Sequence, residues 1–194
     1  MFLIGYWKDK RDMLKYVDTK VVFQEIPDEI TLAINISNCP CHCPGCHSSY
    51  LAEDIGKELT WSGWSTKDSD SLFDLIKKHR GITCVAFMGG DSDPRSINSL
   101  AEKIKWTNSN VQPYVKEWNG EERWQWNPVK VAWYSGRKEL SWDINVENFD
   151  YIKLGPYIEE KGPLSSRTTN QVMLQIDNSY GKPITKDITS RFWK

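Results

Sequence analysis

An α/β fold with a mostly parallel sheet is predicted, because apolar strand-like runs alternate with helical patterns and glycines follow several of those runs. The chain has 194 residues, 39% hydrophobic and 26% charged, which is typical of one globular domain. Strands that alternate with helices are joined by right-handed crossovers and therefore run parallel. Because ligands bind beyond the carboxyl ends of such strands, the loops after the strands are the expected place for a site.

The N-terminal half begins with a mixed charged and aromatic segment. Residues 1–29 are expected to be a lead-in that packs on the main body. A strand is predicted at 30–36, where every second residue is isoleucine or leucine and the other face is small or polar. Residues 52–70 are polar and loop-like, and apolar residues at helical spacing predict a helix over 71–79.

A second buried strand is predicted at 82–88, where the residues are almost all apolar and the run ends in Gly-Gly-Asp. A helix is expected next, since Asp93 can cap it and Pro94 can occupy its first position. Apolar residues recur along this helix at Ile97, Leu100, Ala101 and Ile104.

Three further strands are predicted in the C-terminal half, at 129–134, 151–154 and 172–176. The first ends at Ser135-Gly136, and the helix that a crossover would need before Tyr151 looks short or absent. The charge-rich tail after Asp177 is expected to be a solvated edge.

Asn119-Gly120 predicts a β-hairpin over 114–126, since this pair favours a type I′ turn between two short β-prone runs. We expect residues 107–128 to form a tryptophan-rich insertion. Its aromatic side chains are expected to pack across the hairpin, with docking to a partner as the alternative.

The charge balance argues against some partners. Lys and Arg number 25 and Asp and Glu number 26, a net charge of -1, so the chain lacks the basic excess typical of nucleic-acid or membrane-surface binding. The chain also has no apolar run near the roughly 20 residues that cross a bilayer. We therefore expect no nucleic-acid partner, no membrane association and a cytoplasmic location.

Four of the five cysteines, Cys39, Cys41, Cys43 and Cys46, fall within eight residues, and Cys84 lies far away. So few and so crowded thiols do not form a disulfide framework. A thiophilic metal or an iron-sulfur cluster is therefore the first hypothesis.

The spacing C-x3-C-x2-C runs through Cys39, Cys43 and Cys46, and Cys41 is an extra thiol. A structural zinc site usually takes ligands from two separated pairs, and no second pair follows, so zinc is the second choice. Three thiolates can hold a [4Fe-4S] cluster and leave one iron open to a ligand.

These cysteines, followed by Met88-Gly89-Gly90-Asp91 after the next strand, resemble the radical S-adenosylmethionine (SAM) superfamily. The match is narrower with the activating proteins of anaerobic ribonucleoside-triphosphate reductases. The segments that carry this narrower resemblance are Cys43-Pro44-Gly45-Cys46-His47, Tyr134-Ser135-Gly136, Gly155-Pro156-Tyr157-Ile158-Glu159-Glu160, Leu164-Ser165-Ser166-Arg167 and Asn170-Gln171. The resemblance spans 30–176 and implies one radical SAM domain over 1–194, folded as a partial (incomplete) TIM-like barrel of mostly parallel strands.

The resemblance also implies the roles of individual residues. Cys39, Cys43 and Cys46 would hold the [4Fe-4S] cluster, whose fourth iron would bind SAM. The residues that would contact SAM are Gly45, Cys46, His47, Gly89, Gly90, Asp91 and Ser135. Glycines let the backbone approach a ligand closely, and the Asp91 carboxylate can accept a bond from the ammonium group of SAM.

The implied reaction is reductive cleavage of SAM to a 5′-deoxyadenosyl radical, which makes a glycyl radical on the anaerobic ribonucleoside-triphosphate reductase. A flavodoxin or ferredoxin would supply the electron. Two alternatives remain open from the residues: a small radical SAM enzyme that acts on a small molecule, similar to 7-carboxy-7-deazaguanine synthase, and a non-enzymatic zinc-binding module.

Overall fold

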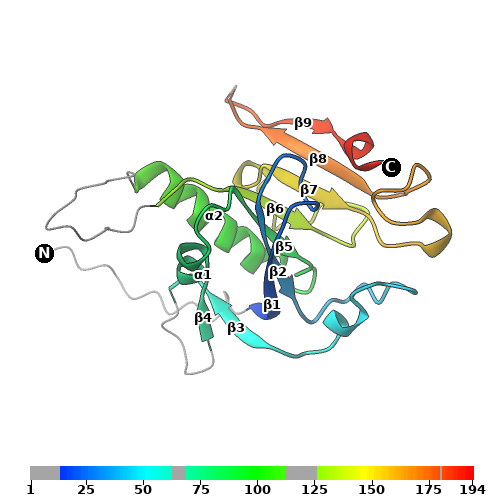
Figure 1. Ribbon diagram of the computed structural model, residues 1–194, viewed down its shortest axis with the longest axis horizontal. Coiled ribbons are helices and arrows are strands. Elements are labelled where there is room, and N and C mark those ends of the chain that lie inside the picture. Colours follow the sequence, from blue (N-terminus) through cyan, green and yellow to red (C-terminus); the bar gives the residue numbers. More distant parts are fainter. Residues whose placement is uncertain (1–13, 63–68, 112–125, 180) are drawn as a thin grey trace, which may run out of the picture.

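The computed structural model describes residues 14–62, 69–111, 126–179 and 181–194 (Figure 1). Its strands form one nine-stranded sheet in the order β4-β3-β1-β2-β5-β6-β7-β8-β9. The strands are β1 (Leu14–Val22), β2 (Thr31–Ile36), β3 (Lys57–Thr60), β4 (Ser69–Ser71), β5 (Cys84–Met88), β6 (Lys130–Tyr134), β7 (Tyr151–Leu154), β8 (Val172–Asp177) and β9 (Ile184–Asp187). Among the described residues there are two α-helices, α1 (Leu72–Lys78) and α2 (Pro94–Asn110).

The centre of the sheet is parallel, as the sequence predicts. β2 pairs with β5, β5 with β6 and β6 with β7, all in parallel register. α2 connects β5 to β6, and a single turn of 3-10 helix, Val146–Asn148, lies between β6 and β7. The helix expected to be short or absent before Tyr151 is therefore reduced to that one turn.

The predicted partial TIM-like barrel of mostly parallel strands is wrong, because the sheet is mixed, with as many antiparallel as parallel pairings, and stays open. β1 runs antiparallel to both β2 and β3, and β7–β8 and β8–β9 are also antiparallel. In the sheet order, β4 and β9 lie at opposite ends and do not pair with each other. Closure needs a continuous stagger of strands around an axis, whereas antiparallel flanks extend the parallel centre sideways as one open layer.

Two segments that the sequence predicts to be a lead-in and a polar loop contribute strands to the sheet. The lead-in holds β1, whose Leu14 and Tyr16 are buried while most of the strand is partly exposed. The polar segment 52–70 holds β3 and the start of β4, a strand of three residues. Residues 1–13 of the lead-in lie outside the described residues.

Both predicted helices are confirmed, and the cap expected at Asp93 is present. The Asp93 carboxylate accepts a hydrogen bond from the backbone N–H of Ser96, and Pro94 is the first helical residue of α2. The Ser71 hydroxyl oxygen accepts from the N–H of Asp74 at the start of α1. A cap of this kind stabilises a helix by about 1 kcal/mol.

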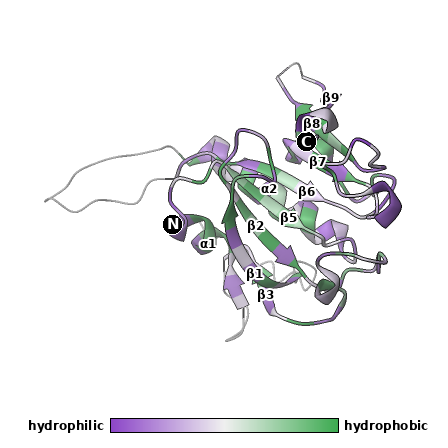
Figure 2. Ribbon diagram, turned by 45° about the vertical axis from the view of Figure 1, so that its right-hand side comes forward, coloured by the Kyte–Doolittle hydropathy of each residue, from purple (hydrophilic) through white to green (hydrophobic). Residues whose placement is uncertain are grey.

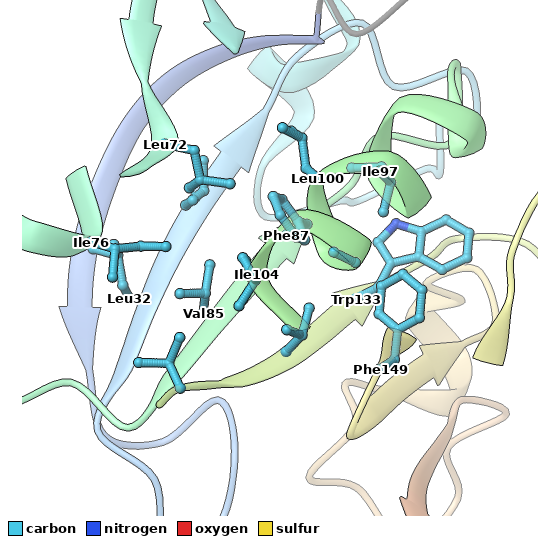
Figure 3. Close-up of a cluster of buried hydrophobic side chains, with 14 of the residues drawn as sticks. Leu32, Leu72, Ile76, Val85, Phe87, Ile97, Leu100, Ile104, Trp133 and Phe149 are labelled. Carbon is cyan, nitrogen blue, oxygen red and sulfur yellow. The ribbon is translucent and has the colours of Figure 1, made fainter. Parts of the chain in front are cut away.

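The main core lies between the sheet and the two helices, which cover the same face (Figures 1 and 3). The apolar stripe of α2 packs against side chains of β2, β5 and β6, and Figure 2 shows that β2 and β5 carry mainly hydrophobic residues. Fully buried members are Leu32, Ile34, Ile36, Val85, Phe87, Ile97, Leu100, Ile104, Val131 and Trp133. This face holds the central strands rigidly and so fixes the loops at their ends.

In the described residues, the opposite face of the sheet is covered by irregular segments and by the 3-10 helix Thr189–Phe192 rather than by α-helices. Small side chains line it, among them Cys84, Ala86 and Ala132, and Ile26 and Ile188 pack over them. Cys84 is fully buried there.

The predicted hairpin over 114–126 lies outside the described residues except for Trp126, because residues 112–125 are not described. Residues 107–110 of the expected insertion belong to α2. Trp126 is buried and stacks on Phe73 at 5.5 Å between ring centroids, so this tryptophan packs in the core. No helix in the described ranges is long and apolar enough to cross a membrane.

Candidate metal and cofactor site

Loops from four neighbouring parallel strands meet at one end of the sheet. The cysteine loop follows β2, Gly89-Gly90-Asp91 follows β5, Ser135-Gly136 follows β6 and Gly155 follows β7. Contacts join these loops directly, including Cys41 to Asp91 and the Ser135 hydroxyl to Asp91. These loops therefore form one continuous rim at the carboxyl ends of the parallel strands, which is where the sequence predicts a site.

The cysteine loop is a tight, irregular turn. Asn38, His42 and Gly45 have positive φ angles of 60°, 42° and 69°, which suit glycine and small polar residues. Backbone hydrogen bonds anchor the loop where it starts, from the N–H of Cys39 to the carbonyl of Leu51 at 2.8 Å. The loop therefore leaves β2 in a fixed direction.

All four loop cysteines are free thiols and half-buried. Burial raises the pKa of the Cys41 thiol to about 12, and the negative charge of Asp91 and the nearby Cys39 add to this effect. Cys41 therefore keeps its proton at neutral pH, and its thiol lies 3.6 Å from Asp91 Oδ2.

Asp91 is the most buried charged group of the rim, with a side chain 1% exposed. Its Oδ1 accepts a hydrogen bond from the Ser135 hydroxyl at 2.5 Å, and its Oδ2 accepts from the N–H of Gly136 at 2.7 Å. The guanidinium of Arg137 lies 3.6 Å from Oδ1 and also donates to the Asp91 backbone carbonyl at 2.7 Å. The carboxylate thus ties the loop after β5 to the loop after β6.

Gly136 is required by the close packing of Cys41. A Cβ on Gly136 would lie 2.6 Å from Cys41 Sγ and 3.5 Å from Asp91 Oδ2. Because carbon and sulfur atoms do not approach so closely without repulsion, any side chain at 136 would displace the Cys41 thiol.

The glycines after β5 are explained by backbone geometry and packing. Gly89 and Gly90 have φ angles of 101° and 88°. A Cβ on Gly90 would lie 2.6 Å from Ile97 of α2, and a Cβ on Gly89 would lie 3.1 Å from the carbonyl of Ile36. These glycines bring α2 and β2 close to the rim, whether or not a ligand approaches them.

Lys153 of β7 is buried and lies near the cysteine loop, where its charge interacts with those of Cys41, Cys43 and Cys46. Its ammonium donates to the backbone carbonyl of Gly155 at 2.6 Å and to that of Ser135 at 3.3 Å. Burial lowers the pKa of Lys153 to about 8, against the opposite effect of the negative charges of Asp91 and Cys43. The lysine places a positive charge within electrostatic range of the loop thiols.

The segment after β7 forms the outer wall of the rim. A Cβ on Gly45 would lie 3.3 Å from Glu159 Oε2 and 3.5 Å from the ring of Tyr157, so this segment packs on the cysteine loop. Beyond it lies a pocket of about 450 Å³, whose lining includes Lys138, Leu154 and Lys161.

The predicted ligand and contact residues divide into two sets. Asp91 and Ser135 are in direct contact and buried, whereas Gly45 and His47 are exposed and Cys46 is half-buried on the cysteine loop. Among the described residues, the compact group of possible ligands for a single ion is Cys39, Cys41 and Asp91, with donor atoms within 4.8 Å of one another. Cys39, Cys43 and Cys46 do not form such a group.

The wider spacing of Cys39, Cys43 and Cys46 is compatible with a cluster, because each thiolate of a [4Fe-4S] cluster binds a different iron. The sequence did not identify Gly136, Arg137 or Lys153 as site residues. Gly136 directly follows Ser135, which is predicted to contact SAM, so the sequence could have identified it together with that residue. The place of Lys153 near the cysteines depends on strand pairing and has no local signal.

Comparison of the chain with protein families, with curated proteins and with solved structures found no match in any of the three. The function of the protein must therefore be inferred from the residues of this rim and from their chemistry.

Proposed function

We propose that the protein is a radical SAM activase that makes a glycyl radical on an anaerobic ribonucleoside-triphosphate reductase. The observation that carries the proposal is the C-x3-C-x2-C loop of free, half-buried thiols at the carboxyl end of β2. The contacts that join this loop to the glycine-containing turns after β5 and β6 support the same proposal.

The donor set fits an iron-sulfur cluster. Thiolates are the ligands that such clusters take, and three of them leave one iron open. Cys39, Cys43 and Cys46 would hold the cluster, which would supply the electron for cleavage of SAM into methionine and a 5′-deoxyadenosyl radical. Lys153 would offset part of the negative charge that three thiolates bring to the loop.

The chain's own residues would bind and orient SAM. The positive φ angles of Gly89 and Gly90 turn the chain at the end of β5, and the lack of a Cβ would let SAM approach the backbone there. The ammonium of SAM would compete with the Cys41 thiol for Asp91 Oδ2, because the other bonds of the carboxylate already go to Ser135 and Gly136. Gly45, Cys46 and His47 would face the adenine from the accessible side of the loop.

The substrate is proposed to be a separate protein. Hydrogen abstraction requires a glycine Cα close to the 5′ carbon of SAM, so a loop of the reductase would enter the rim beside the cysteine loop. The pocket behind the segment 154–161 offers space there for adjoining residues of that loop. A flavodoxin or ferredoxin is the proposed electron donor, and the proposed location is the cytoplasm, where thiols stay reduced.

The test combines the anaerobically reconstituted protein, SAM, a reductant and the reductase from the same source. Electron paramagnetic resonance should show the doublet of a glycine-centred radical on the reductase, and omission of SAM should abolish it. A Cys43→Ala variant is the matched negative control. If SAM is cleaved without a protein radical and a small heterocyclic substrate turns over instead, the activase assignment is refuted and the small-molecule enzyme is favoured.

A further inference from the structure

Cys39, Cys41 and Asp91 form a compact group at the rim that differs from the proposed cluster set. Their donor atoms lie within 4.8 Å of one another, and Cys41 Sγ is 3.6 Å from Asp91 Oδ2. A tetrahedral zinc ion with bonds of about 2.3 Å to sulfur and about 2.0 Å to oxygen separates those two ligands by about 3.5 Å. The distance between thiol and carboxylate therefore already suits a shared ion.

The carboxylate is held in place by neighbours of the kind that orient metal ligands. Ser135 donates to Oδ1 and the N–H of Gly136 donates to Oδ2. Each carboxylate oxygen can accept more than one bond, so Oδ2 retains a lone pair on the side where the Cys41 thiol lies. Hydrogen bonds of this kind to a metal ligand tune the affinity for the metal because they fix the orientation of the ligand.

We propose that Cys39, Cys41 and Asp91 bind a single Zn²⁺ ion, with the fourth position open to water. Two soft sulfurs and one hard oxygen suit this borderline metal. On binding, the ion displaces both thiol protons to solvent. Two thiolates and one carboxylate around Zn²⁺ leave one net negative charge, which the guanidinium of Arg137, 3.6 Å from Asp91 Oδ1, partly balances.

The zinc site goes beyond the proposed function, and a chain that holds zinc cannot at the same time hold the cluster that the proposed function requires. Cys39 belongs to both ligand sets, so a chain that holds zinc lacks one of the three cluster thiolates. Zinc would therefore protect the thiols of the cluster-free protein and at the same time block cluster assembly. This relation explains why the loop carries Cys41 in addition to the C-x3-C-x2-C cysteines.

The test uses the full chain, stripped of metal with a chelator and reduced under argon. Zn²⁺ is titrated in competition with a chromophoric chelator, for the unmodified protein and for Cys41→Ala, Asp91→Asn and Cys43→Ala. We expect one Zn²⁺ per chain, unchanged affinity for Cys43→Ala, and affinity at least about 100-fold weaker for the other two. The loss should exceed the roughly 10–100-fold that is typical when a group that only orients a ligand is removed, because here a direct ligand is lost.

Co²⁺ gives a second measurement on the same samples. Its thiolate charge-transfer absorption should correspond to two sulfurs in the unmodified protein and to one in Cys41→Ala. This variant decides the question if Asp91→Asn does not fold, since Cys41 is half-buried and lies in a loop.

The proposal is overturned if Cys41→Ala binds zinc as tightly as the unmodified protein, or if Cys43→Ala loses zinc while Cys41→Ala keeps it. Iron and sulfide analysis of reconstituted protein is a separate readout. If no cluster assembles, the proposed function is lost and the zinc result still stands. If zinc binding does not depend on Cys41, the zinc site is lost and the activase proposal still stands.

Discussion

Replacing Gly136 with alanine should destabilise the protein through one contact. The new methyl group would lie 2.6 Å from Cys41 Sγ and 3.1 Å from Cys41 Cβ. Gly136 is not among the residues with positive φ, so the backbone itself accepts alanine. Overpacking costs about 1–3 kcal/mol and the stiffer unfolded chain returns about 0.4–1 kcal/mol, which leaves a net loss of up to about 2.6 kcal/mol.

Urea unfolding of four proteins tests this reasoning: the unmodified chain, Gly136→Ala, Cys41→Ala and the double variant. Removal of the sulfur relieves the closest contact, so Gly136→Ala should cost less in the Cys41→Ala background, with a coupling free energy of at least about 0.5 kcal/mol. Gly81→Ala is the control, since its methyl group meets nothing within 4 Å and its φ is +86°. Its cost should not change with Cys41→Ala. Equal costs of Gly136→Ala in both backgrounds would refute the packing of Cys41 on Gly136.

Three further changes test other parts of the molecule. Burial lowers the pKa of Lys153 from 10.5 to about 8, so the folded state loses its proton first and the unfolding free energy should rise between about pH 8 and 10.5. The full difference is worth about 3 kcal/mol, and Lys153→Met should remove this rise in urea unfolding measured across that range. Glu29→Gln should cost about 1–3 kcal/mol, because the buried carboxylate accepts from Lys130 Nζ at 2.5 Å and from the Thr83 hydroxyl at 2.6 Å; no change in the urea midpoint would contradict this. Ile104→Ala should cost about 2–5 kcal/mol, since this fully buried residue of α2 packs in the main core; a thermal midpoint equal to that of the unmodified protein would contradict it.

The elements that the sequence predicts correctly are those with a complete local signal. α2 has a capping Asp93, Pro94 at its start and an apolar stripe at helical spacing, and all three are visible in one stretch of chain. The central strands are apolar runs bounded by glycines, so their ends and the loops after them could be placed. The rim follows from these strands because parallel neighbours end at the same edge.

The barrel prediction is wrong because pairing direction is not a local property. β1 is antiparallel to β2 and joins β3 on its other side, and neither relation leaves a pattern within the lead-in. β4 and β9 are short edge strands: β4 consists of polar residues, and every residue of β9 is exposed. Both therefore lack the apolar alternation that predicts a strand. The resemblance on which the barrel rested covers the rim motifs rather than the edges of the sheet.

At the site, the spacing of residues in the sequence was enough to identify the loop cysteines and the Gly-Gly-Asp turn. It did not predict which residues these cysteines and Asp91 contact. Cys41 and Asp91 are 50 residues apart, and the contact between them depends on the register of β2 and β5. The roles of Gly136 and Lys153 depend in the same way on the pairing of β6 and β7.

The central claim is that Cys39, Cys43 and Cys46 hold a [4Fe-4S] cluster. The most direct measurement is the iron and sulfide content of anaerobically reconstituted, zinc-free protein, with the unmodified chain compared with Cys41→Ala and Cys43→Ala. We predict about four iron and four sulfide per chain for the unmodified protein and for Cys41→Ala, and loss of the cluster in Cys43→Ala. Loss in Cys41→Ala with retention in Cys43→Ala would contradict the ligand assignment.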